Sequence, residues 1–340
     1  MSGSHVIAVI LAAGKGTRMK SDQAKVLHEI FFSPMIHHVL DAVLGLDLAK
    51  TVVVTGHQRQ RVEEALAGYP VAFAEQKEQL GTGHAVLAAQ GEIASSGTTV
   101  LILCGDTPLI RSQTLQQFID GHRQSGAILS VMTTILDDPT NYGRIVTGED
   151  GQILSIVEEK DANDEVRAIR EVNAGIYCVD GRFLLSALKR VGTDNKQGEV
   201  YLTDIVAIAK GDGCQVGRFV CGDADEVLGV NSRIELARAH ACLQERRNLQ
   251  LMTEGVTLLN PATIAVAKTV TIGRDTVIHP QVHISGVTTI GSGCRIGPGA
   301  VLYNCRMGNS VKVGPLVYLK DIDLADHQVI DPPSSRIIRD

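Results

Sequence analysis

Short runs of aliphatic residues alternate with amphipathic stretches from residue 5 to about residue 250. The aliphatic runs have the length of buried strands, and they fall at Val6–Leu11, Thr51–Thr55, Val71–Ala74 and Val100–Cys104. Between them, apolar residues recur at helical spacing over Pro34–Leu46, Arg59–Ala67, Thr82–Gln90 and Ser112–Arg123. Nearly continuous apolar strands that alternate with helices are typical of a parallel sheet covered on both faces. We therefore predict an α/β, Rossmann-like domain with a mixed, mostly parallel sheet over residues 1–230.

Later runs in this part of the chain are less regular and predict strands added around a substrate pocket. They fall at Leu129–Thr134, Arg144–Val146, Val172–Val179 and Gln215–Val220. A stretch rich in Ala, Leu, Arg and Glu, Asn231–Leu251, predicts one long helix. We assign residues 231–253 to a connecting helix.

After residue 264 the helical periodicity gives way to a period of six. Apolar residues hold this phase at Ile272, Ile278, Ile284, Ile290, Ile296 and Leu302, at Met307, Val313 and Leu319, and at Leu324 and Ile330. Glycine often follows the apolar position, where we expect it to permit the corner of a coil. A hexapeptide period is the signature of a parallel β-helix. Residues 254–340 are therefore predicted to form a short left-handed parallel β-helix.

Composition narrows the class of protein. The chain has 340 residues, enough for two domains, and a formal net charge of −6 without any Lys/Arg run, so we expect no nucleic-acid partner. The seven cysteines form no C-x-x-C pair, which favours thiols in a reducing compartment. The apolar run Val6–Ala13 is too short to span a membrane, and no signal-peptide pattern precedes it. We expect a cytoplasmic protein with no membrane partner.

A glycine-rich loop directly after the first strand is the sharpest candidate for a phosphate site. It begins at Leu11 and continues through Ala12, Ala13, Gly14, Lys15, Gly16, Thr17 and Arg18, with Lys25 downstream. Small residues leave backbone N–H groups accessible to a base or phosphate, and open α/β sheets bind ligands at this edge. Arg18 and Lys25 supply cations for a triphosphate. The loop matches neither the Rossmann fingerprint nor the Walker loop.

This loop, with the motifs below, closely resembles the signature of the sugar-activating nucleotidyltransferases, in particular the bacterial N-acetylglucosamine-1-phosphate uridylyltransferase family. The resemblance covers nearly the whole chain. It implies transfer of uridylyl from UTP to N-acetylglucosamine-1-phosphate, which gives UDP-N-acetylglucosamine and pyrophosphate for peptidoglycan and lipopolysaccharide precursors. In this family the domain is commonly fused to a hexapeptide-repeat acetyltransferase.

The resemblance assigns nucleotide and metal contacts. Gln76, Gly81 and Thr82 correspond to the positions that hold the uracil ring, and an amide offers the donor and the acceptor that suit a pyrimidine edge. Gly105 and Asp106 end a strand, where a carboxylate is well placed for Mg²⁺. The family's second metal ligand corresponds to Asn231. Arg18, Lys25 and Asp106 are expected to be the catalytic residues. Taken alone, Asp106 could be a turn residue and Asn231 a helix cap.

For the sugar, the resemblance points to Gly143, Glu158 and Asn173. Glu158 and Glu159 are adjacent and face opposite ways on a strand, so they are not a glycosidase pair. We expect Glu159 to be a solvated charge. The stretch Gly198–Asp204 is expected to shape the pocket.

Three departures from the family pattern bear on function. Ala24 stands where proline is usual, and Cys104 stands where tyrosine is common. The hexads stop after about four coils, before those that supply the family's acetyltransferase site, so we expect these 340 residues to lack that activity. Short β-helices typically pack as trimers, and we expect a homotrimer.

Four alternatives remain open. They are a nucleotidylyltransferase for another sugar or base, a cytidylyltransferase of the isoprenoid pathway, a sole acyltransferase, and a non-catalytic UDP-sugar-binding protein. The cytidylyltransferase is opposed by the hexads and by the Glu-Val-Asn-Ala-Gly stretch at residues 171–175.

Overall fold

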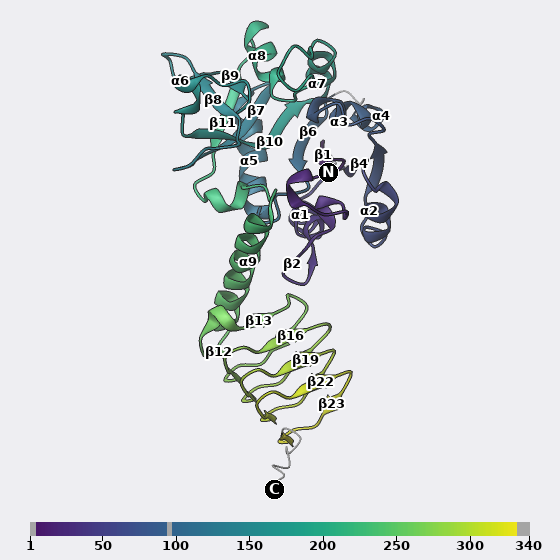
Figure 1. Cartoon of the computed structure of the whole chain (residues 1–340), viewed down its shortest axis with the longest axis vertical. Coiled ribbons are helices and arrows are strands. Elements are labelled where there is room, and N and C mark those ends of the chain that lie inside the picture. The colour runs from purple at the N-terminus through teal and green to yellow at the C-terminus, as the bar shows by residue number, and fades with distance from the viewer. Residues whose placement is uncertain (1–4, 94–96, 332–340) are drawn as a thin grey trace. The chain divides into compact units, whose positions relative to one another are not determined.

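The computed structural model describes residues 5–93 and 97–331 and divides the chain into two units (Figure 1). The first unit comprises Met1–His28 and Pro34–Glu235, and the second comprises Glu29–Ser33 and Leu236–Asp340. The second unit is therefore built from two separate segments of the chain. The pattern of apolar residues in the sequence does not predict this division.

A nine-stranded sheet forms the centre of the first unit, in the order β11-β7-β10-β6-β1-β4-β5, with β8 pairing with β10 and β9. The strands are β1 Val6–Leu11, β4 Lys50–Thr55, β5 Ala72–Glu75, β6 Thr99–Cys104, β7 Leu129–Ile135, β8 Arg144–Thr147, β9 Ile153–Val157, β10 Glu171–Asp180 and β11 Val216–Val220. The sheet is parallel across β6-β1-β4-β5 and antiparallel around β10. The predicted mixed α/β sheet is confirmed.

Helices cover both faces of this sheet. They are α1 Met35–Leu44, α2 Arg59–Ala65, α3 Thr82–Ala88, α4 Gln90–Ile93, α5 Ser112–Ser125, α6 Asp164–Arg167, α7 Gly181–Leu188 and α8 Asp204–Gly211, with 3₁₀ turns η1 Thr17–Met19, η2 Lys25–Leu27 and η3 Ala224–Val227. Alternate residues of β1 enter different cores: Ile10 packs with α1 and α5, whereas Val9 packs with α3 and α7. This explains why β1 is apolar at every position. None of the helices in residues 5–93 and 97–331 is long and apolar enough to cross a membrane.

The second unit contains most of the helix α9 Arg233–Thr253 and the tip of a hairpin formed by β2 Glu29–Ile30 and β3 Ser33–Pro34. Phe31 and Phe32 form the hairpin turn with φ of 43° and 72°, which side chains other than glycine rarely adopt. Their rings lie 5.6 Å from His240 and 4.8 Å from His283, centre to centre. Aromatic packing within the second unit offsets the strain of this turn.

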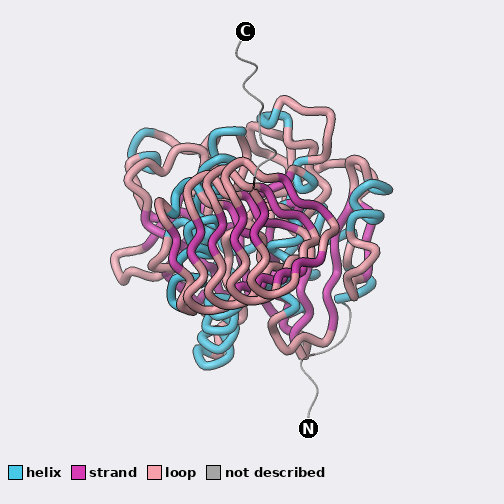
Figure 2. Tube along the Cα trace, turned by 90° about the horizontal axis from the view of Figure 1, so that it is seen from below, coloured by secondary structure: helices cyan, strands magenta, loops and turns pink. Residues whose placement is uncertain are grey.

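The remainder of the second unit is the predicted left-handed parallel β-helix, whose coils lie side by side in Figure 2. One face stacks β12 Thr257–Leu258, β15 Val277–Ile278, β18 Arg295–Ile296, β21 Lys312–Val313 and β24 Val329–Ile330. A second stacks β13 Ala265–Val266, β16 His283–Ser285, β19 Val301–Tyr303 and β22 Tyr318–Lys320, after the turn η4 Pro261–Thr263. The third stacks β14 Thr271–Ile272, β17 Thr289–Ile290, β20 Arg306–Met307 and β23 Asp323–Leu324. The hexad residues from Ile278 to Leu302 are 0–2% exposed, as expected for the interior.

The glycines that follow the apolar positions serve another purpose than the expected one. A Cβ at Gly273 would lie 2.5 Å from the backbone N of Ser292, and one at Gly291 would lie 2.5 Å from the carbonyl oxygen of Gly308. Both partners belong to the next coil. Glycine is therefore required at these two positions for close stacking of coils, whereas positive φ angles occur at other corner residues such as Asp275 and Gln281.

Candidate active site

Two adjoining pockets lie at the carboxyl ends of β1 and β6 in the first unit. The first, called the loop pocket, has a volume of about 480 Å³ and is lined by Leu11–Thr17, Lys25, Val26, Gln76, Gln79, Gly81, Thr82, Ala85, Cys104, Asp106 and Glu199. The second, called the carboxylate pocket, has a volume of about 280 Å³ and is lined by Leu11, Arg18, Thr82, Cys104, Asp106, Thr107, Asn141–Gly143, Glu158, Asn173–Gly175, Tyr177, Leu202, Thr203, Val227, Gly229 and Asn231. Asp106 lines both. The structure thus brings together motifs that are more than two hundred residues apart in the sequence.

The glycine-rich loop presents bare backbone to the loop pocket. Ala12 and Ala13 are 3% exposed, and the N–H of Ala12 donates to the Val54 carbonyl at 2.9 Å, so the start of the loop is fixed to the sheet. A Cβ at Gly14 would meet nothing within 4 Å, which leaves that side of the backbone open to the pocket. The loop can therefore approach a phosphate or a base closely.

Gln76 is 4% exposed and its amide is held from within the protein. Its Nε2 donates to the carbonyl of Gly81 at 3.0 Å and lies 3.1 Å from Nδ1 of His84. Both amide hydrogens are then directed at protein atoms, and the Oε1 acceptor is the group that Gln76 offers to a ligand. His84 thus has a structural role, because it helps to fix the orientation of the Gln76 amide.

Gly81 is needed for a reason other than access to a base. Its φ is +108°, and a Cβ there would lie 2.6 Å from the carbonyl oxygen of Val200. Val200 N–H donates to Leu80 at 2.8 Å, and Leu202 N–H donates to the Thr82 hydroxyl at 3.1 Å. The segment expected to shape the pocket therefore does so by pairing with the loop that begins α3.

Side-chain oxygens of Asp106 and Asn231 both contact the ammonium of Lys25. The ammonium of Lys25 forms an ion pair with Asp106 Oδ2 and donates to Asn231 Oδ1 at 3.0 Å. Asn231 is not the cap of α9, because the Glu235 N–H is accepted by the Ser232 hydroxyl at 3.3 Å. Two oxygen atoms from distant parts of the chain thus face a single point.

Gly105 lines neither pocket. Its N–H donates to the Leu11 carbonyl at 2.9 Å, and a Cβ there would lie 3.2 Å from that oxygen. This glycine lets the chain after β6 pack closely against the start of the glycine-rich loop. Its role in the structure is therefore to position that loop.

The carboxylate pocket contains Arg18, Gly143, Glu158 and Asn173. The Asn173 amide is used locally, since its Nδ2 donates to Tyr177 Oη at 2.7 Å and its Oδ1 accepts from Gly175 N–H at 2.9 Å. These bonds stabilise a bulge in β10 between Asn173 and Tyr177. A Cβ added at Gly143 would lie 3.5 Å from both carboxylate oxygens of Glu158, so glycine leaves room beside this carboxylate.

Burial sets the protonation of this pocket. Desolvation raises the pKa of Glu158, neighbouring acids raise it further, and a hydrogen bond from Thr203 at 3.3 Å opposes the shift. Desolvation, then the charge of Asp106, raises the pKa of the Cys104 thiol to about 12. Desolvation and the nearby Glu235 and Asp106 raise the pKa of Tyr142 to about 12. Cys104 is thus a neutral thiol at neutral pH and is not an activated nucleophile.

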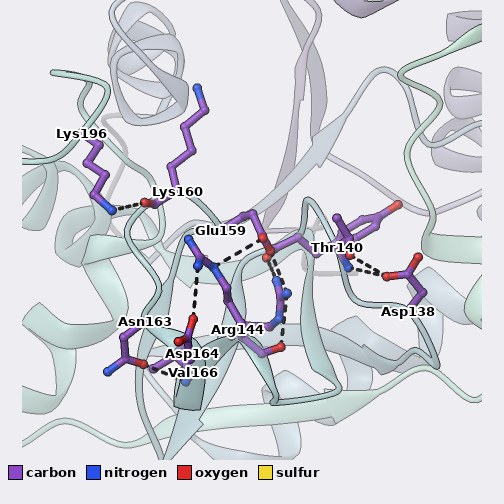
Figure 3. Close-up of polar contacts among 11 residues, drawn as sticks. Asp138, Thr140, Arg144, Glu159, Lys160, Asn163, Asp164, Val166 and Lys196 are labelled. Atoms are coloured by element: carbon purple, nitrogen blue, oxygen red, sulfur yellow. Dashed lines mark hydrogen bonds and ion pairs between the residues drawn. The ribbon is translucent and has the colours of Figure 1, made fainter.

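Glu159 is not the solvated charge that the sequence predicts. Figure 3 shows its carboxylate facing the guanidinium of Arg144, and Oε2 lies 2.7 Å from Nη2. The Arg144 side chain is 2% exposed and also donates to the Tyr142 carbonyl. An uncompensated charge is costly in such a place, so this arginine requires a partner. The pair anchors the loop before Gly143 against the strand that ends before Glu158.

Several lining residues escaped the sequence reasoning. Gln79 and Glu199 face the loop pocket, while Thr203 and Tyr177 face the carboxylate pocket. Glu199 and Thr203 lie in the stretch already expected to shape the site. Tyr177 carried no signal, because a buried aromatic in an apolar strand looks like any core residue.

The fold and the paired pockets define a nucleotide-binding α/β protein with a β-helix appended. Residues 7–224 match the nucleotidyl transferase family, and residues 269–304 match the bacterial transferase hexapeptide (six repeats) family. The chain belongs to the nucleotidyl transferase family.

Its curated relatives carry the name "Bifunctional protein GlmU". The chain is 49% identical to that of Desulfotalea psychrophila over 322 residues, 95% of each protein. It is 50% identical to that of Geobacter metallireducens over 296 residues, 87% of this chain and 62% of the relative. It is 46% identical to that of Heliobacterium modesticaldum, over 96% of this chain and 70% of the relative.

Proposed function

We propose that the protein transfers uridylyl from UTP to N-acetylglucosamine-1-phosphate and releases pyrophosphate. The observation that carries this proposal is the pair of adjoining pockets that share Asp106. One is walled by bare backbone and cations, as a nucleoside triphosphate requires. The other is walled by carboxyl, amide and hydroxyl groups, as a sugar requires. The similarity to proteins named GlmU supports the same reaction.

The loop pocket favours uracil through Gln76. Its Oε1 would accept a hydrogen bond from the N3–H of uracil. Cytosine presents an acceptor at that position, and two acceptors repel. The fixed orientation of the Gln76 amide, held by His84 and Gly81, prevents it from turning to suit cytosine. Recognition of this kind discriminates because the wrong base leaves a buried polar group unpaired.

Asp106 and Asn231 fit a Mg²⁺ ion. Magnesium prefers carboxylate and carbonyl oxygens and keeps room for phosphate and water, and these two side chains already direct their oxygens at one cation. We propose that they would hold the ion. When bound, it would neutralise charge on the phosphate oxygens.

The reaction needs little covalent chemistry from the protein. An oxygen of the sugar 1-phosphate attacks the α-phosphorus of UTP, a new P–O bond forms, and the bond to the β-phosphate breaks. The nucleophile is already anionic, so no general base is required. Arg18 and Lys25 would stabilise the negative charge that builds up on the transferred group. The glycine-rich loop would hold the triphosphate, while Glu158 and the backbone at Gly143 would orient the sugar.

Pyrophosphate release tests this function. The full chain is incubated with each of the four NTPs against N-acetylglucosamine-1-phosphate, glucose-1-phosphate and mannose-1-phosphate, with MgCl₂. We expect the highest kcat/KM for UTP with N-acetylglucosamine-1-phosphate. A preference for another pair would assign another sugar or base, and binding of UDP-sugar without turnover would make the protein a non-catalytic binder.

We also propose that the β-helix assembles as a homotrimer. Large apolar side chains are exposed on it, with Val287 at 74%, Leu316 at 79% and Tyr318 at 65%. Isolated exposed apolar residues are common, but three such residues on one small unit favour burial in an assembly. Light scattering of the full chain should give three times the monomer mass, and a monomer would refute the proposal.

The expected lack of acetyltransferase activity stays a prediction, because the relatives are named bifunctional. The cytoplasm is the location we propose for this activity.

A further inference from the structure

The ammonium of Lys25 sits between Asp106 and Asn231. It contacts Asp106 Oδ2 and lies 3.0 Å from Asn231 Oδ1. The side chains of Lys25 and Asp106 are only 15% and 16% exposed, so the ion pair is largely shielded from water. Solvent screens such a pair much less than it screens one at the surface.

The Asn231 amide and the backbone of Asp106 are held by other hydrogen bonds, whereas the lysine side chain is the part that can move. The Asn231 Nδ2 donates to the Gly229 carbonyl at 3.2 Å, and its backbone N–H donates to Glu235 at 2.7 Å. The carbonyl of Asp106 accepts from Val230 N–H at 2.8 Å. The bond to Gly229 orients the Asn231 oxygen towards the ammonium, and the bond from Val230 holds the backbone of Asp106 beside it. The ammonium itself is joined to the chain by a flexible four-carbon stem.

Gly16 makes this placement of the lysine possible. A Cβ at Gly16 would lie 2.6 Å from Lys25 Cβ, so the base of the stem packs directly against the glycine-rich loop. The ammonium can therefore reach the Asp106–Asn231 pair from the same loop that faces the triphosphate site. A change in its partner requires rotation of the stem alone.

We propose that Lys25 occupies the cation position of the ligand-free protein and gives it up to a divalent metal when the nucleotide arrives. This inference rests on the proposed function. A metal ion and an ammonium cannot share two oxygen ligands, because both are cations and both need the same lone pairs. The triphosphate supplies anionic oxygens to which the ammonium can transfer. The metal site is thereby closed to free cations and opens together with nucleotide binding, so metal and nucleotide strengthen each other's binding.

Manganese binding measured by electron paramagnetic resonance tests this interlock on the full chain without nucleotide. Lys25→Met should bind Mn²⁺ at least tenfold more tightly than the wild type. Lys15→Met is the matched control, since it removes the same charge from the same pocket and Lys15 shares neither oxygen. We expect it to change the affinity less than threefold. Equal affinities for the wild type and Lys25→Met, or equal gains in both variants, would overturn the inference.

A second variant locates the ion. Adding Asp106→Asn to Lys25→Met should abolish the gain in Mn²⁺ affinity, with melting temperatures recorded to verify folding. If the gain persists, the ion binds elsewhere and the inference is wrong. Failure of the proposed function is distinguishable, because it would appear as absence of pyrophosphate release by the wild type while the gain in Mn²⁺ affinity remained.

Discussion

The guanidinium of Arg144 lies 2.7 Å from the carboxylate of Glu159, at the base of the loop that carries Gly143. The arginine is almost fully buried, whereas the glutamate is 28% exposed. Neither residue lines the loop pocket or the carboxylate pocket, yet each is next in sequence to one that lines the carboxylate pocket, Gly143 and Glu158. The ion pair therefore fixes the separation of two proposed sugar contacts.

Replacing one member of this pair should destabilise the fold and weaken sugar binding. Arg144→Met removes the buried guanidinium and leaves Glu159 with the more exposed Arg167, whose Nε lies 3.8 Å from Oε1, so we expect a loss of about 2–3 kcal/mol in the free energy of unfolding. The KM for the sugar phosphate should rise while that for UTP changes little. Urea denaturation and initial-rate kinetics measure both effects.

The double variant Arg144→Met/Glu159→Leu is the control for this prediction. It removes both charges, so it should recover most of the lost stability but not the sugar KM. A double variant as unstable as the single one would show that the arginine contributes through packing alone.

Asp106→Ala should reduce turnover about a thousandfold, because the proposed cation site would lose the Asp106 carboxylate. The fold should stay intact, but the melting temperature should fall, because the shielded ammonium of Lys25 loses its ion-pair partner and keeps the Asn231 oxygen. Asp120→Ala on α5 removes the same charge at an exposed position and should leave the rate unchanged. Near wild-type turnover by Asp106→Ala in MgCl₂ would refute the assignment.

Gln76→Ala should lower the ratio of kcat/KM values for UTP and CTP at least tenfold, because the acceptor that distinguishes N3–H from a bare nitrogen is lost. His84→Ala should act in the same direction and more weakly, since it only loosens the Gln76 amide. Steady-state kinetics with the two nucleotides provide the ratio. An unchanged ratio in Gln76→Ala would exclude this residue from base selection.

The raised pKa of Glu158 predicts that its contribution to the stability of the fold depends on pH. Burial raises its pKa above the ordinary 4.5, so the folded state holds a proton that the unfolded state releases. The stability of the wild type relative to Glu158→Gln therefore falls as pH rises from below 4.5 through the raised pKa. Thermal melts should show Glu158→Gln as the more stable protein at pH 7.5, and equal to the wild type below pH 4.5. A gap that is independent of pH would contradict this.

Gly81→Ala should destabilise the protein by about 2 kcal/mol or more. Its φ of +108° is unfavourable for alanine, and the new Cβ would lie 2.6 Å from the Val200 carbonyl oxygen. Gly91→Ala in α4 is the control, because a Cβ there would meet nothing within 4 Å. Equal melting temperatures for the two variants would mean that the pairing with Val200 is dispensable.

The strands and the β-helix could be predicted from the sequence, because both depend on the periodicity of apolar residues. β1 was predicted with its bounds intact, and the hexads identified the interior of the coils. The hairpin at Phe31 and Phe32 could not be predicted, since two phenylalanines contradict the residue preferences of a turn with positive φ. Tertiary packing against His240 and His283 overrides that preference.

The candidate site followed a similar division. Gly14 and Asp106 were predicted from their positions after strands, and Lys25 from its place downstream of the glycine-rich loop. The pairing of Glu159 with Arg144 could not be predicted, because a charge beside a pocket looks the same in sequence whether water or a buried arginine faces it. Gly81 was identified as a site residue, but the requirement for glycine there comes from close packing against Val200, more than a hundred residues away in the sequence.

The hairpin tip also decides how the protein can be dissected. Phe32 packs against the apolar interior of the second unit, although it precedes the rest of that unit by about two hundred residues in the chain. A recombinant fragment that begins at residue 236 would thus be missing a piece of its own interior and would present the surface that the phenylalanine should cover. Autonomous folding of the carboxyl-terminal half would require Glu29–Ser33 to be supplied, either as a grafted peptide or by complementation with the other fragment.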